Sequence, residues 1–108
     1  MRFYKNLYVS ESMTKKKEKV IAKLKKKKYP LNTYVIALIE EGENQLEFYS
    51  TLMFRQGSVI DDDIFVVGIA GGYDDALYLV EEIAKEVYEK TGDLDIRSYI
   101  REREREEA

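Results

Sequence analysis

Hydrophobic residues recur with a helical period in two long segments of the chain. From residue 73 to residue 90 an apolar side chain returns every three or four positions, which predicts a helix with one broad packing stripe. Segment 11–28 also predicts a helix, but its apolar stripe is narrow and lysines fill the remainder. A short third helix is expected after a cap at Asp95. Residues 101–107 are all charged, and we expect residues 101–108 to form a frayed polar tail.

Four shorter segments predict β-strands, at residues 3–9, 33–40, 45–54 and 64–69. The second and the fourth are apolar at nearly every position, which is typical of strands buried on both faces of a sheet. The order β-α-β-β-β-α favours a single α+β domain over residues 1–108. We expect two layers: a four-stranded, largely antiparallel sheet with both long helices on one face. The strand order stays open, because one crossover and two hairpins permit more than one sheet.

Two helices on one face would leave the other face of the sheet uncovered and unusually apolar. Large exposed apolar patches mark interaction sites in soluble proteins. The leading hypothesis is therefore a small, non-enzymatic interaction domain that forms a homodimer through this second face. Tyr8, Tyr49 and Met53 are the candidate residues of the dimer face.

The charge of the chain is divided unevenly along the sequence. Residues 1–30 carry eleven Lys or Arg against two acids, and residues 31–108 carry seven against nineteen. Such a split indicates an acidic partner for the basic end, or attraction between the two halves within one fold or across a dimer.

The second hypothesis is an anion-binding or nucleic-acid-binding regulator that uses the lysine helix. Segment 11–28 lacks arginine, and Tyr29 is the one aromatic residue beside it, so nothing indicates base recognition. A solvated or internally paired helix face is the competing interpretation. The candidate anion contacts are Lys15, Lys16, Lys19, Lys23, Lys26 and Lys27.

The glycine corner, residues 68–75, invites comparison with phosphate-binding loops, and a small-molecule site or enzyme centre there is the third hypothesis. Its spacing matches neither the P-loop nor the dinucleotide fingerprint, and Asp74 and Asp75 would repel a phosphate. A tight strand-to-helix turn is the plainer interpretation. The aspartates at 61–63, with Asp74 or Asp75, are candidate ligands for a hard cation. Because the run lacks the spacing of a calcium loop, a polar loop is favoured.

Composition narrows the chemistry further. The chain has no cysteine, histidine or tryptophan, which excludes disulfides and thiolate sites and removes the commonest general base. Carboxylate, lysine or tyrosine chemistry stays open, but we identify no catalytic residue and expect no cofactor and no metal. Neither a signal peptide nor a membrane-spanning run is apparent, so we expect a cytoplasmic protein without a membrane partner.

The wording VVGIAGGYDDALYLVEEIAKEVYEKTGDLDIRSYI, together with LYVSES near the start, resembles a family of small uncharacterised proteins of clostridial-type bacteria. The resemblance extends over nearly the whole chain. It implies a stand-alone bacterial cytoplasmic protein, but it implies no activity and assigns no site residue.

Overall fold

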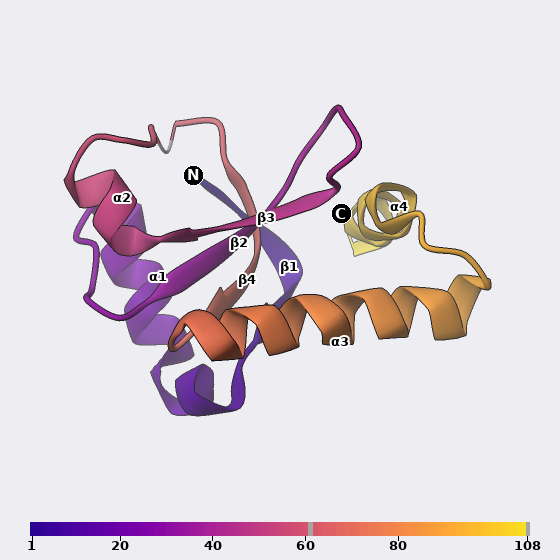
Figure 1. Cartoon of the computed structure of the whole chain (residues 1–108), viewed down its shortest axis with the longest axis horizontal. Helices are drawn as coiled ribbons and strands as arrows, with labels where there is room; N and C mark the ends of the chain where they lie inside the picture. The colour runs from indigo at the N-terminus through magenta and orange to yellow at the C-terminus, as the bar shows by residue number, and fades with distance from the viewer. Residues whose placement is uncertain (61, 108) are drawn as a thin grey trace.

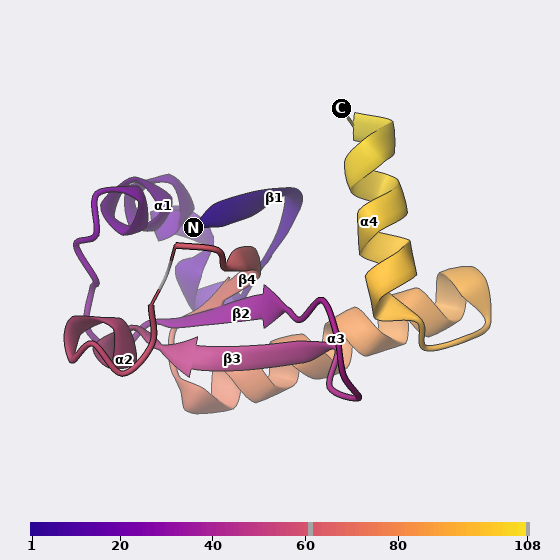
Figure 2. The same ribbon diagram turned by 90° about the horizontal axis from the view of Figure 1, so that it is seen from above.

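A computed structural model describes residues 1–60 and 62–107 of the chain, apart from the side chain of Glu107. The fold is α+β and is built on one four-stranded mixed sheet (Figures 1 and 2). The strands are β1 (Arg2–Val9), β2 (Tyr34–Leu38), β3 (Leu46–Ser50) and β4 (Phe65–Ala70). The helices are η1 (Glu11–Lys16), α1 (Lys17–Lys25), α2 (Thr51–Arg55), α3 (Tyr73–Thr91) and α4 (Ile96–Glu107).

The strands lie in the order β1-β4-β2-β3. All six residues of β4 are buried, as the apolar run predicted, and β4 occupies the interior of the sheet beside β2. β2 pairs antiparallel with both β3 and β4, whereas β1 pairs parallel with β4. The expectation of a largely antiparallel sheet is therefore only partly right. A helical crossover follows β1, which allows it to pair parallel with a strand from much later in the chain.

Helices cover both faces of the sheet, so the expectation of two long helices on one face is wrong. α3 and α4 pack on one face, where Ile36 and Val67 belong to one buried core with Ile83. η1, α1 and α2 lie on the opposite face, where Val35 and Val66 belong to a second core. β2 and β4 are apolar on both sides because each side has a helical layer to bury it. The free apolar face on which the dimer hypothesis rested is thus covered.

The lysine helix is shorter and less regular than the sequence predicts. It begins as the 3-10 turn η1, with Met13 buried, and becomes α-helical at Lys17. It ends at Lys25 rather than next to Pro30, because Lys27 adopts a left-handed conformation with φ 60°. The amide of Lys28 donates to the carbonyl of Lys23 at 2.9 Å, and that of Lys27 to Leu24 at 3.0 Å. These two bonds form the Schellman motif that commonly closes a helix.

The segment predicted as one strand, 45–54, is a strand followed by a helix. Ser50 has φ −66° and ψ 138°, and its side chain accepts a hydrogen bond from the amide of Leu52 at 3.2 Å, which is the geometry of a helix N-cap. α2 therefore begins at Thr51. Neither Leu52 nor Phe54 therefore continues the strand predicted for segment 45–54: Leu52 is exposed, and Phe54 joins the core under α1.

The C-terminal segment is helical through Glu107, where the sequence suggested a frayed tail. Asp95 caps it as predicted, accepting from the amide and the hydroxyl of Ser98 at 3.2 and 2.7 Å. The Arg97 side chain donates to the carbonyls of Ile39, Gly42 and Asn44, which fastens α4 to the β2–β3 hairpin. None of the described helices is both long enough and apolar enough to cross a membrane.

Candidate functional site

The six candidate anion contacts form one exposed surface along η1, α1 and the turn that follows. We call this set, Lys15, Lys16, Lys19, Lys23, Lys26 and Lys27, the lysine surface. Val20 and Leu24 are the fully buried residues of α1, so the helix rests on the sheet by a narrow seam, as the sequence predicts. Most of its circumference faces water, and lysine stems with charged ends occupy it.

The acidic part of the chain does not neutralise the lysine surface. Lys27 Nζ lies 3.4 Å from Asp62 Oδ1, and both of these side chains are largely exposed. Within residues 1–60 and 62–107, the other five lysines have no carboxylate at ion-pair distance. Segment 11–28 contains nine lysines and two glutamates, so most of its positive charge is available to solvent ions or to a partner.

A groove of about 580 Å³ opens between the end of α1 and α2. Its aromatic wall is the ring of Tyr29, which stacks on Phe54 with centroids 5.3 Å apart and an interplanar angle of 28°. Phe54 is buried and supports the half-buried Tyr29 from beneath. The cations lining the groove are Lys23, Lys27, Lys28 and Arg55. Sequence reasoning missed Phe54 and Arg55, because both were assigned to the end of a strand and its loop.

The glycine corner is occupied by side chains of the chain itself. Ser12 Oγ donates to Asp75 Oδ2 at 2.7 Å, and the amide of Gly71 donates to Ser10 Oγ at 3.2 Å. A Cβ at Gly71 would overlap Ser12 Oγ, so the two segments meet at van der Waals distance. This packing favours the turning and packing role for the glycines. A smaller hollow of about 380 Å³ reaches this corner from the lysine side.

A polar cluster that the sequence did not indicate joins β1, α3 and α4. Glu86 Oε2 accepts hydrogen bonds from the hydroxyls of Tyr8 at 2.5 Å and Tyr99 at 3.0 Å. Arg103 Nη1 lies 3.3 Å from the same oxygen and donates to the Tyr99 hydroxyl at 2.8 Å. The four residues come from three distant parts of the chain, so no local sequence motif predicts the cluster.

Burial, and then the hydrogen bond to Glu86, raises the pKa of Tyr8 far above its usual range. The pKa of Tyr99 is raised by the same causes in the same order. Both phenols therefore stay protonated at neutral pH and act as hydrogen-bond donors, not as nucleophiles or bases. The cluster has the features of a structural tie between α4 and the rest of the fold.

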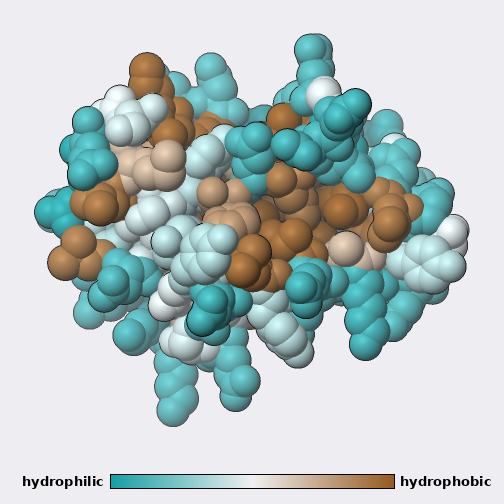
Figure 3. Space-filling view, viewed as in Figure 1, coloured by the Kyte–Doolittle hydropathy of each residue, from teal (hydrophilic) through white to brown (hydrophobic). Residues whose placement is uncertain are grey.

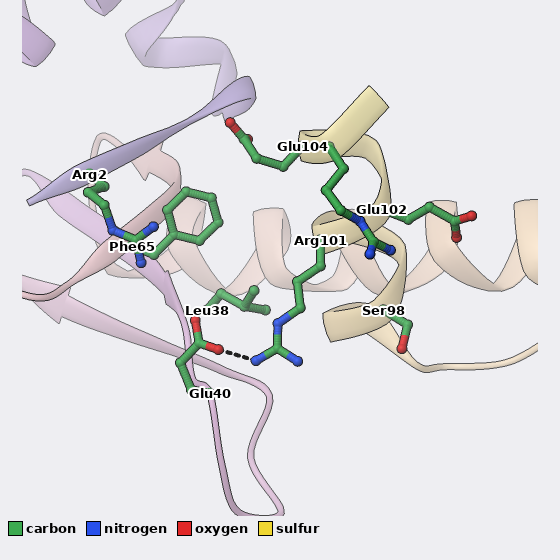
Figure 4. Close-up of a pocket in the computed structure, with 9 residues that line it drawn as sticks. Arg2, Leu38, Glu40, Phe65, Ser98, Arg101, Glu102 and Glu104 are labelled. Atoms are coloured by element: carbon green, nitrogen blue, oxygen red, sulfur yellow. Dashed lines mark hydrogen bonds and ion pairs between the residues drawn. The ribbon is translucent and has the colours of Figure 1, made fainter. Parts of the chain in front are cut away.

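A second candidate ligand space is a cleft of about 620 Å³ between α4 and the sheet (Figure 4). Its apolar floor is Phe65 and Leu38. Arg2 lies over the Phe65 ring at 4.9 Å, and Arg101 forms an ion pair with Glu40 across the mouth. The rim mixes basic and acidic side chains, namely Arg2, Arg101, Arg105, Glu40, Glu102 and Glu104. Because the basic and acidic side chains are equal in number, the cleft favours neither an anionic nor a cationic ligand.

The three residues expected at a dimer face are not brought together. Tyr8 packs against the core beneath α3, and Tyr49 against the core on the opposite face of the sheet. Met53 lies on α2 and is 36% exposed. The prediction grouped these residues because it expected one uncovered face of the sheet. Helices cover both faces, and the three residues are separated.

The aspartates considered for a cation do not converge. Asp62 lies beside Lys27, and Asp75 accepts from Ser12. Within the described part of the chain no group of three or more acidic side chains has a geometry that would hold a metal ion. Asp61 lies outside the described residues.

Comparison with protein-family models, with curated proteins and with solved structures returned no match. The resemblance to small clostridial-type proteins therefore stays an expectation.

Proposed function

We propose that this protein binds nucleic acid through its phosphates, with the lysine surface as the contact. The observation that carries the proposal is the absence of neutralising carboxylates around five of the six lysines within the described chain. Lysines that contact phosphates release condensed counterions, which supplies most of the affinity of sequence-independent binding. A folded protein that needed these lysines only for internal pairing would hold them beside its acids.

The groove beside Tyr29 supports a single strand as the preferred form. Single-stranded binding combines a positive track for the backbone with aromatic rings on which bases stack. Here Tyr29 is half-buried, supported by Phe54, and flanked by Lys23, Lys28 and Arg55. α1 has nine residues and spans about 13 Å, enough for a few phosphates. Binding is then modest in affinity, indifferent to sequence and strongly dependent on salt.

The test is fluorescence anisotropy with labelled single-stranded DNA and RNA of about 20 nucleotides. For about three to five phosphate contacts, raising the salt from about 50 to about 200 mM should weaken binding by roughly 10- to 100-fold. The double variant Lys19→Gln/Lys23→Gln should weaken binding at about 50 mM salt by about tenfold, since two contacts are lost.

The matched control is Lys85→Gln/Lys90→Gln, which removes the same charge from α3 on the other face of the sheet. We expect it to change the affinity less than about twofold. Equal losses in the two double variants would mean that net charge, and not the lysine surface, governs binding. No detectable binding of DNA or RNA at about 50 mM salt would end the proposal.

A further inference from the structure

The two edge strands of the sheet, β1 and β3, differ in regularity and in how far other elements cover them. At the β1 edge the pairing with β4 is interrupted between Phe3 and Tyr8, and the amide of Lys5 in this interval donates to Glu104 of α4 at 3.2 Å. Bulging an edge strand and covering it are two ways in which proteins prevent further strand pairing. At the β3 edge the ladder with β2 is regular over all five residues, Leu46–Ser50. Of the two edges, the β3 edge is therefore the one that could pair with a further strand.

Alternate residues of β3 turn their backbone groups outward. The amide of Thr51 donates to Thr33, and that of Ile39 donates to Gln45, so odd-numbered residues of this strand pair with β2. Because antiparallel pairs alternate, the N–H and C=O groups of Leu46, Phe48 and Ser50 point away from β2. An unpaired row of this kind is a template for another strand.

An apolar surface borders this open edge. The rings of Tyr34, Phe48 and Tyr73 contact one another at centroid distances of 5.6–6.1 Å. At 100° per residue, the flank of α3 nearest to Phe48 carries Tyr73, Leu77, Val80, Ala84 and Tyr88 and no charged side chain. Tyr73, Leu77 and Tyr88 are 55%, 40% and 59% exposed. Figure 3 shows apolar side chains gathered in the middle of the face that carries β3 and α3.

We propose that a second copy of this chain occupies this surface, by antiparallel pairing of β3 with the same strand of the partner. A two-fold axis at Phe48 aligns the outward groups of Phe48 with the partner's Phe48, and those of Leu46 with the partner's Ser50. The paired strands bring the two Tyr34, Phe48 and Tyr73 clusters together under the joined sheet. Such an interface is isologous, and one strand and one helix flank serve both copies.

The charges at the ends of β3 favour a second copy over another strand. In the antiparallel register, the hairpin before β3, with Glu41 and Glu43, lies beside the partner's Arg55, which follows its own β3. All three side chains are exposed, and within the described residues none has an ion-pair partner. The two-fold axis produces this complementary contact twice.

The assembly joins two four-stranded sheets into one continuous sheet, with the lysine surfaces of both copies on the same face. A single strand of nucleic acid would then meet two basic surfaces instead of one. The dimer does not rest on the proposed function, since its mass is measured without nucleic acid.

The first test is the mass in solution at about 100 µM chain, by size-exclusion chromatography with light scattering. We expect twice the chain mass of 12.7 kDa. Leu77→Glu places a charge in the apolar surface and should shift the chain to monomer, with a dissociation constant at least about 30-fold weaker. The control Tyr78→Glu adds the same charge to an exposed position on the other flank of α3 and should stay dimeric.

The second test removes one outward amide from the edge. Ser50 has φ −66°, which proline adopts without strain, so Ser50→Pro removes the N–H that pairs with the partner's Leu46. Ser50→Ala loses the same helix cap but keeps the amide. Proline should weaken the dimer by about tenfold relative to alanine, since the two-fold axis removes two hydrogen bonds.

A wild-type monomer at about 100 µM would overturn the proposal. A dimer that survives Leu77→Glu, or that responds equally to Ser50→Pro and Ser50→Ala, would show that the copies meet elsewhere and would overturn it as well. Circular dichroism of each variant separates loss of pairing from loss of fold.

Discussion

α3 and α1 lie on opposite faces of one sheet and differ in length, burial and charge. α3 has 19 residues, four of them fully buried, and its charged residues are six acids and two lysines. α1 has nine residues, rests on Val20 and Leu24, and carries four lysines and one glutamate on the rest of its surface. One helix is committed to the core, and the other keeps most of its surface in water.

This difference means that the residues that stabilise the fold and the residues proposed to bind nucleic acid lie on different helices. The side chains proposed to contact phosphates contribute little to the core, because their burial is slight and their ion pairs are few. The acids of α3, on the far face, repel the same ligand and so favour approach from the lysine side. A chain with a small net charge can therefore present a strongly basic surface.

The comparison is tested most severely by truncating one buried residue in each helix. Ile83 of α3 and Leu24 of α1 are 0% and 1% exposed. Ile83→Ala should lower the free energy of unfolding by about 4 kcal/mol, because the long helix and the sheet hold the cavity open. Leu24→Ala should lower it by about 2 kcal/mol, since the short α1 can settle into the space. Urea titration at neutral pH measures both values.

A loss for Leu24→Ala equal to that of Ile83→Ala would break the contrast. It would mean that α1 is as firmly part of the core as α3. The lysine surface should in either case keep its affinity for nucleic acid in Ile83→Ala while the variant remains folded.

The elements that the sequence predicted well are those with a strong period or a dense apolar run. α3 and β4 carry their pattern in consecutive residues, and β2 does so as well. The end of β3 was missed because a single cap, Ser50, turns the chain into α2 against a β-like sequence. The face of the sheet on which each helix packs was not predicted, because no local sequence pattern specifies it.

The candidate site was predictable in part for the same reason. The lysines are visible in the sequence, but their lack of carboxylate neighbours is a property of the folded chain. The groove depends on Phe54 and Arg55 reaching Tyr29 across the fold. The helical C-terminus likewise depends on distant partners, since Arg101 pairs with Glu40 and Arg103 with Glu86.

A smaller effect is expected from the contact that lets α3 approach the sheet. A Cβ at Gly68 would lie 3.2 Å from Ile36 Cδ1, 3.3 Å from Leu79 Cδ2 and 3.3 Å from the carbonyl of Tyr8. Gly68→Ala should therefore cost about 2 kcal/mol, because α3 has to move outward. At Gly72 an added Cβ meets no atom within 4 Å, and Gly72→Ala should change stability by less than about 0.5 kcal/mol. Equal thermal stability of the two variants would show that α3 does not depend on this close approach.

The smallest expected effect compares one phenol from each core. Burial, and then a hydrogen bond to a carboxylate, raises the pKa of Tyr8 above its usual range and raises the pKa of Tyr49 to about 12. Below about pH 10 both phenols are protonated in the folded and the unfolded chain, and their contribution is complete. Above pH 10 the unfolded phenols ionise while the folded ones do not, so the free energy of unfolding falls as pH rises. Tyr8→Phe should cost about 1 kcal/mol at pH 7, the value of one hydrogen bond, and should flatten this alkaline loss.

Tyr49→Phe should flatten the alkaline loss as well, but only up to about pH 12, where the folded phenol itself ionises. The two variants therefore diverge above that pH, with the Tyr8 variant the more resistant. Denaturant titrations between pH 8 and pH 12.5 measure this difference. Identical curves for the two would mean that the α3 side protects its phenol no better than the α1 side, and the contrast between the two helices would then be one of charge alone.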